Sequence, residues 1–527
     1  MTFTIQWPDG VKHDCYSPST VIASHLAQGE LHSVDAFLDR TRTALLLASE
    51  RVRARYGYEC SSALDQLRKL EERASHLTPE ARSGPVLVLA VTLRNASADA
   101  STARSPAKKY AVCVIGGGQA GLSMSYLLKE AGVDHIVLEK NDIAHSWDKE
   151  RWDSFCLVTP NYQCRLPGYE YNGSDPQGFM VKDEIVQFLR GYAASFSPPL
   201  VTGVSVKTVV PEGAEFVITT QVGTICAEQV VVATGGYHDP KVPAFAAEIP
   251  TSITQIHSRD YKSPEQLPAG EVLVVGSGQS GCQIVEDLML AGRKVHFAVG
   301  DAPRCARRYR GRDVVEWLEL MGHYQIPIDQ MPDPAAARAK TNHYVTGRDG
   351  GHDLDLRQFA LDGLRLYGTL CGYAAGPGQA AGKLQFLPNL TSCLDAADDT
   401  YRRINKNIDD FIERQGITAP PGSVYEPVWS PTADPTEVDL ATAGITSIVW
   451  SIGFAPNFRF VQAPIFDSRG SPEQSRGVTA TPGLYFLGLP WLHTWGSGRF
   501  CGVADDARYL LQRILARADT RATQLSA

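Results

Sequence analysis

The sequence predicts an α/β protein with two Rossmann-like domains, preceded by a small α+β domain. From Tyr110 onward a continuous apolar run, a glycine-rich turn, a helix pattern and a second apolar run follow one another, and the same succession recurs from Glu271. Continuous apolar runs are typical of parallel strands that are buried on both faces. The small polar residues of 96–108, ASADASTARSPAK, are typical of a linker and separate residues 1–95 from the rest.

Residues 1–95 carry the patterns of a small domain with both strands and helices. TFTIQW alternates like a strand and runs into the turn PDG. Ser33 can cap a helix whose apolar residues recur at helical spacing as far as Gly57. SALDQLRKLEERA indicates a second helix, and VLVLAVTL indicates a closing strand. No catalytic pattern is recognisable in this domain, and we expect Cys15 and Cys60 to be buried and structural.

The composition excludes several classes of function. The net charge of −8 argues against a nucleic-acid partner and against an anionic membrane surface. No stretch approaches the roughly 18 apolar residues of a membrane span, and the first residues lack the pattern of a signal peptide. The 11 cysteines form no CxxC pair, which indicates reduced thiols in a cytoplasmic protein without a metal site.

The first glycine-rich turn is GGGQAG, which lies between a strand pattern and a helix pattern. In such a GxGxxG motif the glycines allow a tight turn, let the backbone approach a pyrophosphate and let the helix pack on the strand. The helix N-terminus offers free N–H groups to the phosphates. A glutamate closes the next strand, where a carboxylate takes the ribose hydroxyls. The residues predicted to contact this first dinucleotide are Gly116, Gly118, Gln119, Ala120, Gly121 and Glu139.

The second glycine-rich turn, GSGQSG, predicts a second dinucleotide site. Its predicted contacts are Gly276, Gly278, Gln279, Ser280 and Gly281.

The residues that follow this second turn predict which dinucleotide it binds. At the position after the second turn that corresponds to Glu139 after the first, the residue is Val299, so the expected carboxylate is missing. A cluster of arginines follows, from which Arg307 and Arg308 are the predicted contacts. A missing acid beside arginines suits a 2′-phosphate and predicts NADPH. Asp301 lies close by, and its negative charge argues against a 2′-phosphate there.

Two such folds in one chain, together with HSRDYK at residues 257–262, resemble the flavin-containing monooxygenases and their Baeyer–Villiger and N-hydroxylating relatives. Further segments are similar to motifs of that family, namely ATG at 233–235, SIGF at 451–454, and GLYFLGLPWLHTWGSG and GVADDA near the C-terminus. The pattern W-x4-WDSFxLVTPN, from Trp147 to Asn161, resembles a bacterial branch of putative monooxygenases. The FxG that precedes HSRDYK in the family is absent, because Thr251 and Ile253 stand there, and this departure leaves the subfamily open.

The resemblance implies FAD at the first turn and NADPH at the second. In the family, NADPH reduces the flavin, O2 adds to it, and a flavin hydroperoxide transfers one oxygen atom to a small organic substrate by N- or S-oxygenation or a Baeyer–Villiger reaction. Asn161 falls where the family places an asparagine beside the flavin, so it is the candidate catalytic residue. The resemblance adds Trp147, Thr234, Gly235 and Asp506 as cofactor contacts.

The resemblance also implies a discontinuous FAD-binding domain, residues 109–245 and 440–515. The NADPH-binding domain, residues 246–439, is then inserted between these two segments. Residues 313–440 are the least similar part, and we expect them to shape the substrate pocket.

Residues 1–95 resemble a different family, the small nitrogen-starvation response proteins, through WPDG, CYSPS and RTALLLASERVRARYGYECSSAL. Members of both families tend to lie beside nitrilase genes, which implies a natural fusion and partners from a nitrilase-type pathway. The apolar face of the first helix is expected to dock on the flavoprotein or on a second copy of the chain, and the second case would give a homodimer.

Three alternatives to a monooxygenase stay open at this point. A pyridine-nucleotide disulfide reductase shares the fold but needs two cysteines at CxxC or CxxxxC spacing, whereas Cys156 and Cys164 are eight residues apart. A flavin oxidase or dehydrogenase without a second nucleotide is opposed by the second turn. A non-catalytic redox-regulatory protein is suggested by the N-terminal domain.

Overall fold

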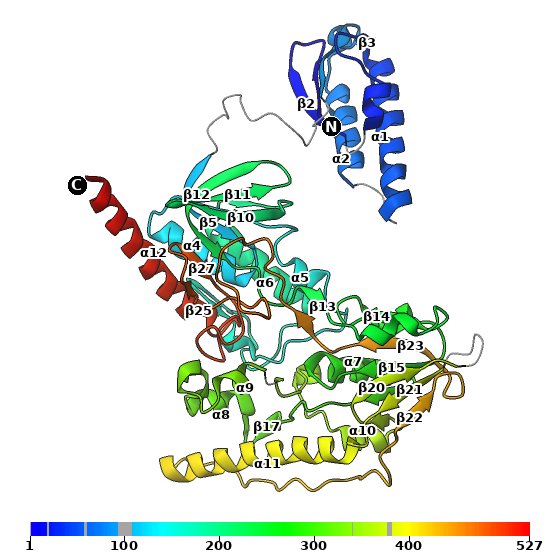
Figure 1. Ribbon diagram of the computed structural model, residues 1–527, viewed down its shortest axis with the longest axis vertical. Coiled ribbons are helices and arrows are strands. Elements are labelled where there is room, and N and C mark those ends of the chain that lie inside the picture. Colours follow the sequence, from blue (N-terminus) through cyan, green and yellow to red (C-terminus); the bar gives the residue numbers. More distant parts are fainter. Residues whose placement is uncertain are drawn as a thin grey trace. The chain divides into compact units, whose positions relative to one another are not determined.

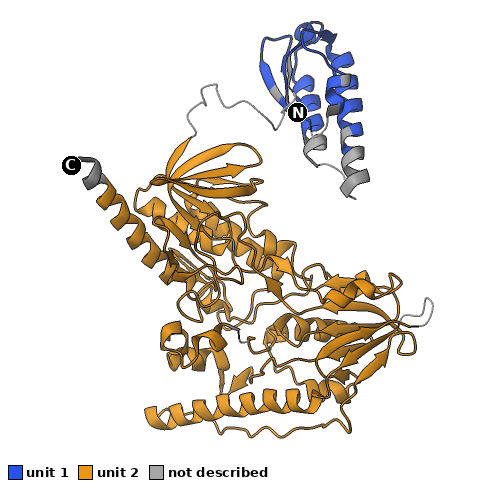
Figure 2. Cartoon of the chain, in the orientation of Figure 1, with its two compact units in different colours: residues 1–105 blue, residues 106–527 orange. Residues whose placement is uncertain are grey.

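The computed structural model of the protein describes residues 2–17, 20–56, 61–92, 108–339, 341–376 and 382–526. The chain divides into two compact units, residues 1–105 and 106–527 (Figure 2). The predicted helix end at Gly57, Cys60 and residues 96–107 of the predicted linker lie outside the described residues. In the described parts, no helix combines the length and the apolar character that crossing a bilayer requires.

The first unit is built on a four-stranded antiparallel sheet with the strand order β2-β1-β4-β3. Its strands are β1 (Thr2–Gln6), β2 (Lys12–Tyr16), β3 (Leu31–Ser33) and β4 (Pro85–Thr92). Its helices are α1 (Val34–Tyr56), α2 (Ser61–Ser75) and α3 (Pro79–Arg82). Ser33 caps α1 as predicted, because its Oγ accepts a hydrogen bond from the Ala36 amide at 3.3 Å.

The core of the first unit explains why its sequence alternates. Phe3, Ile5 and Trp7 are fully buried, since every second side chain of a strand points to the same face of the sheet. Phe37 of α1 and Leu70 of α2 are buried in the same apolar cluster. This unit therefore has a core of its own.

The second unit begins with a nine-stranded sheet (Figure 1). Five of its strands are parallel, in the order β27 (Leu484–Phe486), β12 (Thr224–Val232), β5 (Lys109–Ile115), β6 (His135–Leu138) and β9 (Leu200–Val201). The antiparallel strands are β10 (Val206–Glu212), β11 (Glu215–Thr220), β25 (Gln474–Ser475) and β26 (Val478–Thr479). The chain thus leaves this sheet after β12 and returns to it near the C-terminus.

Helices pack against this first large sheet. They are α4 (Gln119–Glu130), α5 (His145–Asp148), α6 (Lys182–Phe196) and α12 (Val503–Ser526). Figure 1 shows α12, in red, running beside α4, and the two helices are in contact. The apolar run predicted as a buried strand is β5, in which Val112, Cys113 and Val114 are inaccessible to solvent.

The second large sheet is entirely parallel and has five strands. In order they are β14 (Thr254–His257), β23 (Ile445–Trp450), β15 (Glu271–Val275), β16 (Val295–Ala298) and β19 (Arg365–Tyr367). The helix α7 (Gln279–Leu290) follows β15, as the repeated pattern in the sequence predicts. This second Rossmann-like fold, together with the α+β domain that precedes both folds, confirms the predicted α/β class.

The position of β23 corrects one boundary drawn from the sequence. Residues 440–515 were expected to belong with the first sheet, but Ile445–Trp450 pairs with β14 and β15 of the second. The return to the first sheet therefore comes after Trp450. A strand's sequence shows that it is buried but not which sheet it joins, and this explains the difference.

Most of the remaining helices and strands lie between β16 and β23 in the sequence. The helices are α8 (Val314–Leu320), α9 (Pro334–Ala339), α10 (Leu356–Leu361) and α11 (Leu390–Gln415). A three-stranded sheet contains β20 (Leu370–Ala374), β21 (Lys383–Phe386) and β22 (Glu437–Asp439). Two-stranded pairs are β7 (Arg165–Leu166) with β8 (Tyr169–Glu170), β13 (Asp239–Pro240) with β24 (Phe454–Ala455), and β17 (Arg308–Tyr309) with β18 (Arg312–Asp313).

Candidate functional site

Both glycine-rich turns line a single cavity of about 1180 Å³ in the second unit. The two turns follow β5 and β15, so each lies at the carboxyl end of a parallel strand, where open α/β sheets bind their ligands. The sequence-predicted residues that line the cavity are Gly116, Gly118, Gln119, Ala120, Glu139, Trp147, Thr234, Gly235, Gly276, Gly278, Gln279 and Ser280. The structure therefore brings most of the predicted contacts of both turns together.

The three glycines of the first turn have two different roles. Gly116 and Gly121 allow close backbone packing, and Gly118 leaves space for a ligand. A Cβ added to Gly116, whose φ is 110°, would lie 2.6 Å from the Ala233 carbonyl oxygen. A Cβ on Gly121 would lie 1.8 Å from the Gly116 carbonyl oxygen, so this glycine lets α4 approach β5. A Cβ on Gly118 would meet no atom within 4 Å and would project into open space. The backbone at Gly118 is thus free to approach a phosphate.

The N-terminus of α4 is open to the cavity. Gly118 is the N-cap residue and, having no side chain, satisfies none of the first amides of the helix. Unpaired amides and the helix dipole together favour an anion at this point. Thr234 lines the same cavity, and its buried Oγ1 has no hydrogen-bond partner within the described part of the chain. An open helix N-terminus and an unpaired hydroxyl fit the phosphate-bearing dinucleotide that the sequence predicts here.

Glu139 follows β6 and is fixed at the edge of the cavity by two backbone amides. Its Oε2 accepts a hydrogen bond from the Gly117 amide at 2.6 Å, and its Oε1 accepts one from the Asn141 amide at 2.8 Å. These bonds hold the carboxylate beside the turn that would bind the pyrophosphate. A carboxylate in this position can accept hydrogen bonds from ribose hydroxyls.

Gln119 and Trp147 connect the first turn to the C-terminal segment. Gln119 donates from Nε2 to the Gly498 carbonyl oxygen at 3.0 Å, and Trp147 donates from Nε1 to Gln119 Oε1 at 3.2 Å. The Trp147 ring also stacks on Phe500, with centroids 5.8 Å apart and planes inclined by 21°. These contacts place an aromatic wall along the cavity.

The second turn repeats the geometry of the first. A Cβ on Gly276, whose φ is 102°, would lie 2.7 Å from the Ser451 carbonyl oxygen, and a Cβ on Gly281 would lie 1.8 Å from the Gly276 carbonyl oxygen. Gln279, the first residue of α7, hydrogen-bonds the Val345 carbonyl oxygen. Ser451 lines the cavity, and its buried Oγ has no hydrogen-bond partner among the described residues. A Cβ on Gly278 would meet only Thr341 Cγ2, at 3.5 Å, so the backbone of this turn also leaves room for a ligand.

The arginines predicted to bind a phosphate do not line the cavity. Arg307 is 1% exposed, forms an ion pair with Asp313 at 2.5 Å, and donates to the Val158 carbonyl oxygen at 2.8 Å. Arg308 is exposed and donates to the Gly350 carbonyl oxygen at 3.0 Å. The phosphate role predicted for both residues finds no support in this geometry.

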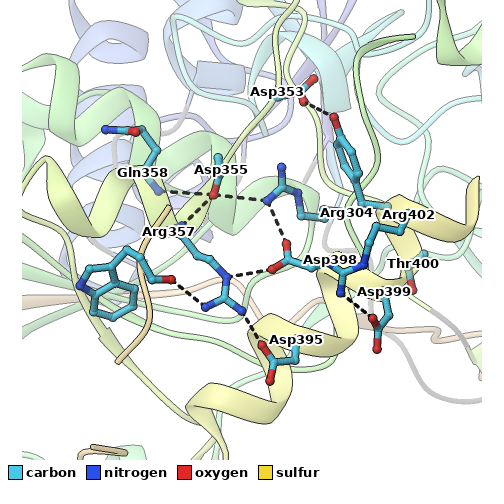
Figure 3. A network of polar contacts seen from close by, with 12 residues as sticks. Arg304, Asp353, Asp355, Arg357, Gln358, Asp395, Asp398, Asp399, Thr400 and Arg402 are labelled. Atoms are coloured by element: carbon cyan, nitrogen blue, oxygen red, sulfur yellow. Dashed lines mark hydrogen bonds and ion pairs between the residues drawn. The ribbon is translucent and has the colours of Figure 1, made fainter. Parts of the chain in front are cut away.

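Arg304, from the same cluster, belongs to a buried network that Figure 3 shows. Its guanidinium pairs with Asp398 at 3.0 Å and with Asp355 at 3.3 Å. Arg357 of α10 pairs with the other oxygen of Asp398 at 2.8 Å and with Asp395 at 2.6 Å. This network joins α10 and α11 to the segment after β16.

Asn161, the candidate catalytic residue, does not line the cavity either. It is 4% exposed, its Nδ2 donates to the Asp175 carbonyl oxygen at 2.9 Å, and its Oδ1 accepts from the Met180 amide at 2.7 Å. Both ends of the amide are thus engaged by backbone groups. This arrangement gives Asn161 a structural task, fixing the loop that ends at Met180.

Asp506 lies behind the cavity and supports it indirectly. Its Oδ2 accepts a hydrogen bond from Ser497 Oγ at 2.5 Å, and Ser497 lines the cavity. Burial raises the pKa of Asp506, against the opposing effects of Ser497 and Arg476. Asp506 therefore positions the 497–500 segment rather than contacting the cavity.

Sequence patterns missed two arginines that do line the cavity. Arg499 lies over the Trp495 ring, 3.7 Å from its centroid, and donates to Asn342 Oδ1 at 3.0 Å. Arg151 lies over Trp147 at 5.2 Å. In the described residues neither arginine has a carboxylate within ion-pair distance, and burial lowers the pKa of both. Two positive charges without acidic partners make this part of the cavity suited to anionic groups.

Of the cysteines that the structure describes, no two line the cavity together. Cys156 lines the cavity and points its thiol at the Phe179 carbonyl oxygen, 3.4 Å away. Cys164 is buried and does not line the cavity. Burial raises the pKa of both thiols to about 12, so neither is poised as a thiolate nucleophile.

Comparison with known protein families finds a match in each unit. Residues 2–91 match a family described as nitrogen starvation-induced protein NitG. Residues 113–319 match the family of the pyridine nucleotide-disulphide oxidoreductases. These matches confirm that the N-terminal domain resembles the nitrogen-starvation proteins and that the rest of the chain is an oxidoreductase.

Individual relatives extend this picture. A protein described as an uncharacterized CzcO-like oxidoreductase of Geobacillus kaustophilus is 31% identical over 407 residues, which cover 77% of this chain and 98% of the relative. An indole-3-pyruvate monooxygenase of Oryza sativa subsp. japonica is 30% identical over 190 residues, 35% of this chain and 47% of the relative. A solved flavin-containing monooxygenase from Stenotrophomonas maltophilia covers 78% of this chain and 99% of its own, with a TM-score of 0.51 and 20% identity. The last likeness is one of fold.

Proposed function

We propose that this chain, which belongs to the family of CzcO-like oxidoreductases, is a flavoprotein monooxygenase that binds FAD at the first glycine-rich turn and a nicotinamide dinucleotide at the second. The observation that carries the proposal is that both turns open into the same cavity. Two dinucleotides held in this way can bring their reactive rings together. The proposed reaction transfers one oxygen atom of O2 to a small organic substrate, by N- or S-oxygenation or by a Baeyer–Villiger reaction.

FAD fits the residues of the first turn. The open N-terminus of α4 and the bare backbone of Gly118 would receive the pyrophosphate, and Glu139 would receive the ribose hydroxyls. When bound, the flavin supplies the capacity to take a hydride from the nicotinamide and to activate O2. The residues of this chain bind and orient the two nucleotides and keep water from the reacting centre.

The aromatic wall is suited to excluding water. Trp147, Phe155 and Phe500 all line the cavity, and the Trp147 ring contacts both phenylalanines. An apolar enclosure protects reactive species from hydrolysis and strengthens electrostatic interactions inside the site. Arg151 and Arg499 would add two positive charges, which can meet phosphate oxygens or an acidic group of the substrate.

Oxygen transfer is favoured over disulfide reduction by the state of the thiols. A disulfide reductase needs a thiolate near the flavin, and burial keeps Cys156 and Cys164 protonated at neutral pH. The sequence relative from rice is named as a monooxygenase, which supports the same reaction class. The experiment must distinguish oxygen transfer from two alternatives, which are flavin oxidase or dehydrogenase chemistry and a redox-regulatory role.

The decisive experiment is oxygen labelling. The FAD-loaded full chain is supplied with NADH or NADPH, 18O2 and a panel of amines, sulfides and ketones, and products are analysed by mass spectrometry. We expect one compound class to raise nicotinamide oxidation and to gain one 18O atom. Nicotinamide oxidation that yields only hydrogen peroxide with every class would identify an oxidase, and reduction of disulfide substrates would identify a reductase.

A further inference from the structure

We propose that the second turn is built for NADH rather than NADPH, and that Asp301 sets this choice. The inference rests on the proposed function, because it concerns the nicotinamide dinucleotide assigned to that turn. It reverses the preference predicted from the sequence, where nearby arginines indicated NADPH.

The topology locates the adenosine ribose beside the end of β16. In a Rossmann-like fold the strand that follows the fingerprint helix carries the residue that contacts the 2′-position, about 20 residues beyond the glycines. Here β16 follows α7 and pairs in parallel with β15. Val299 comes directly after β16 and is 3% exposed, so its side chain is turned into the core. Asp301 is exposed and lines the cavity.

The loop that carries Asp301 is tied to the glycine-rich turn. The Gly300 amide donates to Ser277 Oγ at 2.9 Å, and Ser277 is the second residue of that turn. This bond places Asp301 next to the turn that would hold the pyrophosphate. In the described residues Asp301 forms no ion pair, so its carboxylate is available to a ribose hydroxyl and would repel a 2′-phosphate.

Among the described residues, the arginines that follow β16 do not line the cavity, so they do not offset this repulsion. Arg304 and Arg307 are neutralised by buried carboxylates away from the cavity. Among the described residues, the lysines and arginines that line the cavity are Lys140, Arg151, Arg259 and Arg499. None of them follows β16 or its neighbour β19.

Two of these four cations are remote by topology. Lys140 follows β6, which belongs to the other large sheet. Arg259 follows β14, and the order β14-β23-β15-β16 separates these strand ends by three strand spacings, about 14 Å. Arg499 is held by Trp495 and Asn342, and Arg151 by Trp147. Among the described residues, a 2′-phosphate beside Asp301 would therefore find no lysine or arginine at the ends of β15, β16 or β19 in the cavity.

The test is a binding measurement that does not depend on flavin chemistry. Isothermal titration calorimetry compares ADP-ribose with 2′-phospho-ADP-ribose on the FAD-loaded full chain. We expect ADP-ribose to bind at least about tenfold more tightly. Asp301→Asn should reduce this ratio and Asp301→Arg should invert it. Glu248→Gln, an exposed carboxylate outside the cavity, is the matched control and should leave the ratio unchanged.

Each outcome decides the proposal. Tighter binding of the 2′-phosphorylated compound by the natural chain, or an unchanged ratio in Asp301→Asn with flavin still bound, would overturn it. Absence of binding by both compounds would overturn it together with the nicotinamide site. If ADP-ribose is preferred but no oxygen reaches any product, the coenzyme proposal stands and the monooxygenase proposal fails.

Discussion

The carboxylate of Glu139 and the amide of Gly117 are joined by a hydrogen bond of 2.6 Å, which ties the end of β6 to the first glycine-rich turn. The bond fixes the side chain that would hold the ribose relative to the backbone that would hold the pyrophosphate. Two ligand-contacting groups thus have their spacing set before a dinucleotide binds, which lowers the entropic cost of binding.

Gly118→Val should abolish FAD binding. A Cβ at this position projects into the open space beside the α4 N-terminus, where the proposed pyrophosphate would lie, so a branched side chain would fill that space. The measurement is the flavin-to-protein ratio of the purified variant. Ala131→Val, at the exposed far end of the same helix, should keep a full complement of flavin. A Gly118→Val protein that retains all its flavin would show that FAD binds elsewhere.

Asp398→Asn should destabilise the second unit strongly. The change removes the charge between Arg304 and Arg357, and loss of one partner from a buried ion pair costs about 3–5 kcal/mol. Asp399→Asn is the control, because Asp399 pairs with Arg402 at the surface of the same helix and should matter little. The free energies of unfolding in urea provide the comparison. Equal stability of the two variants would contradict the weight given to this network.

The stability of the second unit should fall as the pH is lowered from about 7 to about 5.5. Burial lowers the pKa of six histidines, namely His135, His238, His257, His296, His323 and His493. In the unfolded chain these groups take up protons near pH 6.5, whereas in the folded chain they resist protonation, so acid favours unfolding. Scanning calorimetry across this range measures the effect, and His323→Gln should flatten it. A transition temperature that rises on acidification would oppose this account.

A chain that starts at Lys108 should still bind FAD and oxidise the nicotinamide coenzyme. The first unit has its own core, and the described residues that line the cavity belong to the second unit. Flavin content and anaerobic reduction of the truncated chain are the measurements. A folded truncated protein without flavin would mean that residues 1–107 belong to the active site.

Two expectations for the first unit stay predictions, namely partners from a nitrilase-type pathway and formation of a homodimer.

The glycine-rich turns could be predicted because their geometry is local. Gly116 and Gly121 are five residues apart and meet each other directly, and the same holds for Gly276 and Gly281. A short sequence pattern is therefore enough to explain why glycine stands at these positions. The capping of α1 by Ser33 was predictable for the same reason.

The charges could not be predicted because their partners are distant in the chain. Arg304 belongs to the arginine cluster that indicated a phosphate site, but its guanidinium pairs with Asp398 of α11. Asn161 followed a family motif, yet the structure engages its amide with the backbone of Asp175 and Met180. No sequence motif around Arg499 indicates a binding site, and it is the tertiary fold that brings this residue to the cavity. In each case tertiary packing, not local sequence, decides the role of the side chain.

The central claim is that two dinucleotides meet in one cavity, and anaerobic titration of the purified full chain with NADH tests it most directly. The protein should be yellow, and its visible flavin absorption should bleach on addition of the nicotinamide without any added substrate. NADPH should bleach it less readily, because we propose that Asp301 would repel its 2′-phosphate. A protein that carries no flavin, or whose bound flavin stays oxidised with both nicotinamides, would contradict the account.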